Sequence, residues 1–166
     1  MSKLPTVAII GQANVGKSSL FNRLTRSRTA IVAREAGTTR DNVVGKVSYK
    51  RRNVDSAPSD DYSQFWLIDT AGLKTAEDEF EATIQDQIAD ASAAADVILV
   101  TVDSTAYPSD ADRQLAKKAL KSGKPVILIA NKADLKGSLP IDEFKRLGIK
   151  NIIKTSAEHS IGISEL

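Results

Sequence analysis

The feature that most constrains the fold is a glycine-containing segment, residues 11–18, which reads GQANVGKS. The residues before it, 6–10, are apolar or β-branched and predict a buried strand. Residues 19–24 predict a helix with one apolar face. A strand, a Gly-x-x-x-x-Gly-Lys-Ser loop and a helix in this order are typical of a phosphate-binding loop in an α/β domain.

The chemistry of this loop depends on its backbone. Its glycines let successive N–H groups converge on phosphate oxygens, and the following helix adds the positive end of its dipole. We expect the Lys17 ammonium to reach the β- and γ-phosphates and the Ser18 hydroxyl to hold Mg²⁺. The alternative is a strand–helix turn without a ligand. The residues expected to bind the phosphates are Asn14, Val15, Gly16, Lys17, Ser18 and Ser19.

The composition is that of one globular domain. With 166 residues, of which 42% are hydrophobic and 27% charged, the chain is long enough to bury a single core. It has no cysteine, which excludes disulfides, thiolate metal sites and cysteine nucleophiles. No stretch approaches the ~20 apolar residues of a membrane span, and the N-terminus lacks a signal-peptide pattern. We therefore expect a soluble, cytoplasmic protein without stable membrane association.

The net charge is only +2, but the charges are unevenly distributed. Residues 23–52 carry nine Lys or Arg, whereas residues 77–112 carry ten Asp or Glu and no Lys or Arg. The basic segment is either an RNA-contacting surface or, as we favour, a solvated loop and strand edge beside a bound polyanion. Its basic residues are Arg23, Arg26, Arg28, Arg34, Arg40, Lys46, Lys50, Arg51 and Arg52.

Strands and helices alternate along the chain, which predicts an α/β fold: a mostly parallel six-stranded sheet with helices on both faces. The predicted strands span residues 6–10, 41–49, 64–68, 97–102, 126–130 and 151–154. The predicted helices span residues 19–24, 77–94, 109–122 and 141–147, and another helix begins at 161–166. The second and third strands form one antiparallel hairpin around a long polar loop, residues 50–63. Residues 1–166 are thus expected to be a single domain, cut from a longer multidomain protein.

Two further segments follow predicted strands, at the edge where open α/β sheets bind ligands. Residues 69–72 read DTAG, where Asp69 would hold the Mg²⁺ shell through water and the Gly72 N–H would meet a terminal phosphate. Alone, this motif is usually a turn. Residues 131–134 read NKAD, and the Asp134 carboxylate would accept the adjacent N1–H and N2 amine of guanine. Adenine would leave that carboxylate unpaired, which argues against an ATP-dependent phosphotransferase.

The remaining base contacts are expected from Asn131, Lys132 and the pair Ser156-Ala157 after the last strand, whose backbone N–H would meet guanine O6. His159 is the only histidine and is interpreted as a surface or packing residue. Trp66 alternates within a predicted strand and is interpreted as core or sheet surface.

Taken together, residues 11–18, Thr39, 69–72, 131–134 and 156–157 resemble the five motifs of the translation-factor-like GTPases, whose Ras-like G domain has the P-loop GTPase fold. In finer detail, NVGKS at 14–18 and GTTRD at 37–41 resemble the first G domain of the tandem GTPase family EngA, also called Der. That resemblance implies a GTP-hydrolysing switch in assembly of the large ribosomal subunit, followed by a second G domain and a KH-like domain. The isolated domain is then expected to be monomeric.

The chain departs from the usual EngA pattern at Gln12-Ala13, at Ala71 and in its longer hairpin loop. Its GTTRD segment and residues 69–73 are equally similar to the tRNA-modifying GTPase MnmE, which stays an alternative.

The resemblance also implies a mechanism. Lys17 and a Mg²⁺ ion held by Ser18, Asp69 and Thr39 would cover the phosphates, with Gly72 at the γ-phosphate. Leu73 stands where Ras-like enzymes place a water-positioning glutamine, so a nucleotide-binding interaction module with little turnover is a further alternative. GTPases of this kind with asparagine at the Asn14 position can use K⁺ beside the phosphates. Otherwise Asn14 is a locally hydrogen-bonded loop residue.

Overall fold

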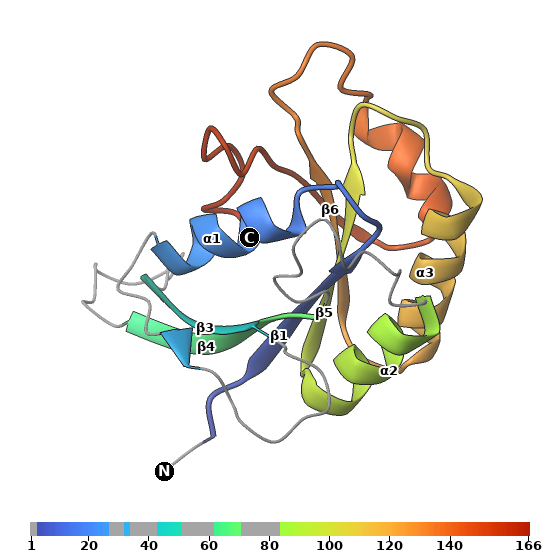
Figure 1. Cartoon of the computed structure of the whole chain (residues 1–166). Helices are drawn as coiled ribbons and strands as arrows, with labels where there is room; N and C mark the ends of the chain where they lie inside the picture. Colours follow the sequence, from blue (N-terminus) through green and yellow to red (C-terminus); the bar gives the residue numbers. More distant parts are fainter. Residues whose placement is uncertain (1–2, 27–31, 34–42, 51–61, 71–83) are drawn as a thin grey trace, which may run out of the picture.

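The computed structural model describes residues 3–26, 32–33, 43–50, 62–70 and 84–166. Within them, seven strands form one sheet in the order β2-β3-β4-β1-β5-β6-β7 (Figure 1). The strands are β1 (Thr6–Gly11), β2 (Val32–Ala33), β3 (Val43–Lys50), β4 (Tyr62–Asp69), β5 (Val97–Asp103), β6 (Val126–Asn131) and β7 (Asn151–Lys154). The helices are α1 (Lys17–Arg26), α2 (Ile84–Ala94), α3 (Asp110–Lys121) and the 3₁₀ helix η1 (Ile141–Leu147).

The predicted α/β fold is confirmed. β1 lies at the centre, parallel to β4 on one side and to β5 on the other, and β6 and β7 continue the parallel order. β3 and β4 are the predicted antiparallel pair. The two-residue strand β2 pairs antiparallel with β3 and extends the sheet beyond the six predicted strands. A strand this short carries no readable alternation, which is why the sequence pattern misses it.

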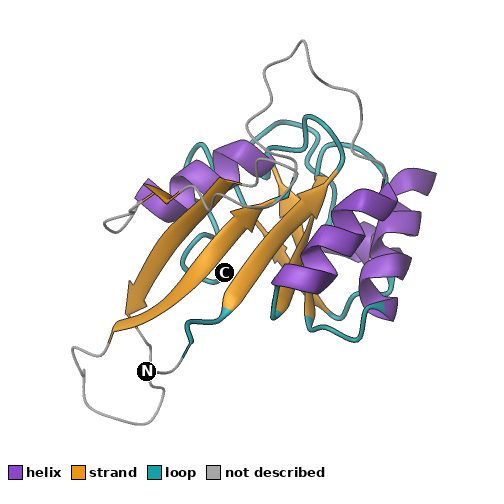
Figure 2. Ribbon diagram, turned by 60° about the horizontal axis from the view of Figure 1, so that its bottom comes forward, coloured by secondary structure: helices purple, strands orange, loops and turns teal. Residues whose placement is uncertain are grey.

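Helices cover both faces of the sheet, with α1 on one face and α2 and α3 on the other (Figure 2). Alternate residues of β1 face opposite layers, so Ile9 packs with α1 whereas Ala8 and Ile10 pack with α2 and α3. β1 is therefore buried on both faces. Its carboxyl end, which leads into residues 11–18, is held firmly on both sides.

The α1 face shows how closely helix and sheet approach. A Cβ atom added to Gly45 of β3 would lie 2.4 Å from the Thr25 methyl group and 2.9 Å from the Phe21 ring. A glycine at this position therefore lets α1 lie directly against the strand. Trp66, interpreted as core or sheet surface, lies on the sheet with the Lys46 ammonium 6.0 Å from its ring centre.

The structure differs from the prediction at residues 161–166. Residues 161–166 do not begin a helix: residue 161 bridges back to Ser156 and the following residues form a turn. The reason is that the N–H and carbonyl of residue 161 both bond to the backbone of Ser156, so they do not begin a helix. The N-terminal part of the predicted 77–94 helix and most of the 50–63 loop lie outside the described residues. Among the described helices, none is long and apolar enough to cross a membrane.

Candidate functional site: two interlocked loops

The phosphate loop, residues 11–18, leaves β1 and enters α1 through two left-handed backbone positions. Asn14 has φ 63° and Gly16 has φ 96°. An added Cβ at Gly16 would lie only 2.2 Å from the side-chain amide nitrogen of Asn131. Gly16 is thus required twice, because of its backbone conformation and because another side chain occupies the space where its own would be.

The Lys17 side chain folds back over the same loop. It is only 8% exposed, and its ammonium donates hydrogen bonds to the carbonyl oxygens of Gly11, at 2.9 Å, and of Gln12. A buried ammonium needs such partners. This arrangement places the positive charge at the loop, where the sequence motif predicts a phosphate-binding lysine.

A second loop, residues 131–134 after β6, is bonded directly to the phosphate loop. The Asn131 amide donates to the Val15 carbonyl at 3.1 Å, and the Lys132 ammonium donates to the Asn14 carbonyl at 2.6 Å. The two loops lie more than a hundred positions apart in the sequence. Folding therefore brings the candidate phosphate-binding and base-binding residues into direct contact.

Lys132 is itself held by Asp103 at the end of β5. The Lys132 ammonium lies 2.8 Å from the Asp103 carboxylate, which also accepts hydrogen bonds from the N–H and hydroxyl of Thr105. Burial alone would raise the pKa of Asp103, but the hydrogen bonds from Lys132 and Thr105 outweigh it and hold that pKa below its usual value. Asp103 is therefore an ionised anchor for Lys132.

Asn131 is 3% exposed and also binds the chain after β7. Its side-chain oxygen accepts hydrogen bonds from the Thr155 hydroxyl at 3.0 Å and from the Ala157 N–H at 3.2 Å. The sequence predicts that a backbone N–H of the Ser156-Ala157 pair meets guanine O6; in this structure the Ala157 N–H is directed at Asn131. Asn131 links the phosphate loop, β6 and the end of β7.

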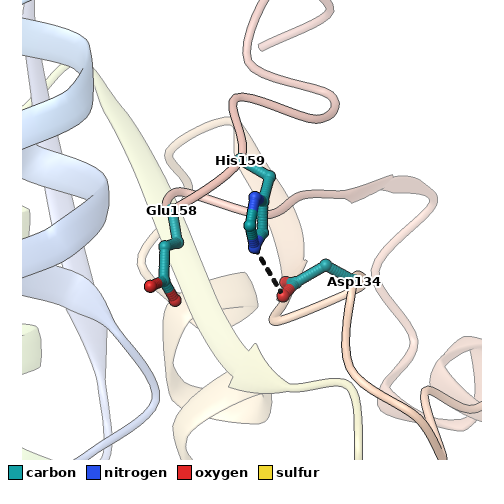
Figure 3. A group of neighbouring side chains, drawn as sticks. All are labelled: Asp134, Glu158 and His159. Carbon is teal, nitrogen blue, oxygen red and sulfur yellow. Dashed lines mark ion pairs between the residues drawn. The ribbon is translucent and has the colours of Figure 1, made fainter.

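Asp134 lies opposite residues 156–159, which we call the base loop. Figure 3 shows the His159 ring directed at Asp134, with Glu158 beside them; His159 Nε2 is 3.4 Å from the Asp134 carboxylate. The hydrogen bond from Ser156 is the main cause that lowers the pKa of Asp134; burial opposes it and the nearby His159 adds to it. The carboxylate is consequently ionised at neutral pH, as acceptance of two guanine donors requires.

The candidate metal ligands Ser18 and Asp69 come from adjacent elements. Ser18 lies in the first turn of α1 and is exposed, and Asp69 ends β4, where it is in register with Ile9 of β1. Asp69 is only 1% exposed. A hydroxyl and a buried carboxylate are oxygen ligands of the kind Mg²⁺ prefers, so the residues present fit that ion.

Three predicted residues, Thr39, Gly72 and Leu73, lie outside the described residues. The structure also adds contacts that sequence reasoning missed. Gln12 donates to Ser109 and Asp112 at the start of α3, at 2.8 and 2.7 Å. No sequence signal marks these contacts, because each joins residues about a hundred positions apart.

Arg23 belongs to the basic segment that we interpret as a solvated loop and strand edge, with an RNA-contacting surface as the alternative. Its guanidinium is directed at the base loop, where it donates to the carbonyl oxygens of Ala157 and Glu158. The charge pattern alone could not distinguish an arginine with these backbone contacts from a solvated arginine.

Comparison with known proteins places this site in a family context. A family model described as 50S ribosome-binding GTPase matches residues 6–132. GTPase Der from Gemmatimonas aurantiaca is 39% identical over 166 residues, which cover 98% of this chain and 35% of that protein. The chain therefore spans about a third of the length of that curated relative.

Two solved structures of Era are similar to this chain in fold. A single-residue variant of Aquifex aeolicus Era, bound to GDP·AlF₄⁻, has a TM-score of 0.68 and 29% identity over 99% of this chain and 55% of its own. Era in complex with MgGDPNP and nucleotides 1506–1542 of 16S ribosomal RNA has a TM-score of 0.66 and 29% identity, with the same coverage.

Proposed function

We propose that this chain, which belongs to the 50S ribosome-binding GTPase family, is a G domain that binds GTP and hydrolyses it to GDP and phosphate. The observation that carries the proposal is the direct bonding of residues 131–132 to the phosphate loop, with the Asp134 carboxylate three residues along. This arrangement joins a triphosphate site to a carboxylate suited to guanine. One ligand that needs both features is a guanine nucleotide.

The nucleotide is proposed to lie along the interlocked loops. Backbone N–H groups of residues 14–19 and the Lys17 ammonium bind the phosphates, and Asp134 accepts the N1–H and N2 amine of guanine. The hydrogen bonds from Asn131 and Lys132 to the phosphate loop fix the distance between the phosphate-binding residues and Asp134. A backbone N–H of the Ser156-Ala157 pair is proposed to contact guanine O6. For Ala157 this would require that its N–H exchange the Asn131 side-chain oxygen for the base.

Hydrolysis requires that the negative charge developing on the phosphates be neutralised. Ser18, Asp69 and Thr39 would hold Mg²⁺, which would supply positive charge to the phosphates. Lys17 contributes a second fixed charge, and the Gly72 N–H is proposed to bind the γ-phosphate. For Thr39 and Gly72 the support is the motif resemblance.

A potassium ion is proposed as a further charge, with Asn14 as one ligand. The Asn14 side chain is exposed at the loop, while its carbonyl is taken by Lys132. The amide oxygen of the side chain is thus the atom of Asn14 suited to a monovalent cation.

We further propose that the chain is one G domain of a longer Der-type protein that acts on the large ribosomal subunit in the cytoplasm. The family description and the relative named GTPase Der support this over a role in tRNA modification. Cosedimentation of the chain with purified 50S subunits, compared between a non-hydrolysable GTP analogue and GDP, tests it. Equal absence from the 50S fraction with both nucleotides would contradict a contact made by this domain.

Base specificity tests the central proposal. Asp134→Asn replaces an acceptor pair by one acceptor and one donor, so GTP affinity should fall by about 2 kcal/mol or more while xanthosine triphosphate gains affinity. Equilibrium titration of both nucleotides measures this, with Asp142→Asn as a control at an exposed aspartate. Unchanged GTP affinity in the Asp134 variant would refute the proposed guanine site.

A further inference from the structure

Arg23 connects the helix of the phosphate loop to the base loop. It lies on α1, which begins at Lys17, and its guanidinium donates to two consecutive carbonyl oxygens, that of Ala157 from Nε and that of Glu158 from Nη2, each at 2.6 Å. Hydrogen bonds from a charged donor are shorter and stronger than neutral ones. The planar, pre-organised guanidinium suits such paired contacts.

These contacts fix the orientation of the base-loop peptides. A peptide group is planar and trans, so the N–H of one residue points away from the preceding carbonyl oxygen. Holding the Glu158 carbonyl toward Arg23 therefore turns the His159 N–H to the opposite side. There it donates to the Ser156 hydroxyl oxygen at 3.1 Å.

The base loop reaches the Asp134 carboxylate through His159 and Ser156. The His159 Nε2 atom lies 3.4 Å from the Asp134 carboxylate, and the His159 backbone N–H donates to the Ser156 hydroxyl. Ser156 is 1% exposed, and it is the main cause that lowers the pKa of Asp134. The segment that Arg23 holds is therefore the segment that faces Asp134.

Besides the bonds from Arg23, the end of the base loop is held by the His159 N–H bond to Ser156 and by the contact of the His159 ring with Asp134. Glu158 and His159 are both exposed, so apolar burial does not hold them in place. Arg113, by contrast, forms an ordinary surface pair with Asp110, with side chains 52% and 89% exposed. The two arginines therefore allow a comparison between a half-buried arginine that bonds to backbone carbonyls and a surface arginine that pairs with a carboxylate.

We propose that Arg23 is a positioning residue for guanine recognition, acting on Asp134 through the base loop and Ser156. This inference rests on the proposed function, since it requires that Asp134 read guanine. Arg23 lies on the helix that follows the phosphate loop, but its proposed role is in binding the guanine base.

The test compares GDP with inosine diphosphate, which differs from GDP only by lacking the N2 amine that Asp134 is proposed to accept. Affinities of both are measured by calorimetry for the wild-type chain, Arg23→Ala, Arg23→Lys and the control Arg113→Ala. In Arg23→Ala we expect GDP affinity to fall about tenfold, inosine diphosphate affinity to fall less, and the preference for GDP to shrink toward one. Arg23→Lys, which keeps the charge without the planar pair of donors, should lie between.

A merely structural role for Arg23 would lower both affinities together and leave their ratio unchanged, and that outcome overturns the inference. If Arg23→Ala does not fold, the ratio in Arg23→Lys decides the question. Ser156→Ala should reduce the same ratio, and combining it with Arg23→Ala should add little, because both changes act on the same loop. A wild-type chain that binds neither nucleotide refutes the proposed function itself, together with this inference, whereas wild-type binding with an unchanged ratio in the variants refutes the inference alone.

Discussion

Gly16→Ala tests whether the two loops are interlocked as described. The left-handed backbone, with φ 96°, costs an alanine roughly 1–2 kcal/mol. The added Cβ would also lie 2.2 Å from the Asn131 amide nitrogen, and overpacking of this kind costs about 1–3 kcal/mol more. We therefore expect the free energy of unfolding to fall by about 2–5 kcal/mol in total.

Gly137→Ala is the matched control. Gly137 has φ 93°, nearly the value at Gly16, but an added Cβ would meet no atom within 4 Å. This variant should therefore lose only the backbone part, roughly 1–2 kcal/mol. Urea unfolding of both variants without nucleotide, followed by circular dichroism, gives the difference between them.

A third variant isolates the contact itself. In an Asn131→Ala background the space beside Gly16 is open, so Gly16→Ala should then cost no more than the matched control. The reasoning is refuted if Gly16→Ala and Gly137→Ala lower the free energy of unfolding equally in the otherwise unchanged chain. It is also refuted if Gly16→Ala lowers this free energy as much in the Asn131→Ala background as in the otherwise unchanged chain.

Three further outcomes follow from the site. Asn131→Ala removes three buried hydrogen bonds and should lower the free energy of unfolding by about 3 kcal/mol, against about 0.5 kcal/mol or less for the exposed Asn151→Ala; equal urea midpoints would contradict this. Because the folded-state pKa of Asp103 is depressed, its contribution to stability is complete above the unfolded pKa and is lost as the pH falls through the folded value. Between about pH 5 and 3 the wild type should therefore lose stability more steeply than Asp103→Asn, and parallel curves would count against the anchor. Replacing K⁺ by Na⁺ at equal ionic strength should slow phosphate release about tenfold, or about 1.4 kcal/mol, and Asn14→Ala should abolish the difference while retaining nucleotide binding; equal rates in the two salts would argue against K⁺.

Most of the architecture was predictable because its signals are local. Apolar runs mark the parallel strands, and Ser109 and Asp112 form the capping box that begins α3 close to its predicted start. The motif resemblance to the EngA or Der family is confirmed for the same reason, since each motif occupies a few consecutive residues. That the loops at 11–18 and 131–134 lie close together follows from one rule, since parallel strands present their carboxyl ends at the same edge of a sheet.

The side-chain partners could not be predicted, because they depend on tertiary distance. Arg23 is one of nine basic residues in its segment, and nothing in the sequence separates it from the others. Asp103 ends an apolar strand and resembles any polar strand terminus. The final segment, residues 161–166, has helix-compatible residues, but its bridge to Ser156 gives its backbone another hydrogen-bonding partner.

The bond between Val15 and Asn131 also has a consequence for the order of folding. It spans 116 positions, so residues near the beginning of the chain acquire their final shape only after β5 and β6 have joined the sheet. Contacts of such long range form late, because closure of the intervening chain must come first. A nucleotide that binds only the completed pair of loops would then slow the unfolding of the native domain. It would not speed folding, because its binding site forms late.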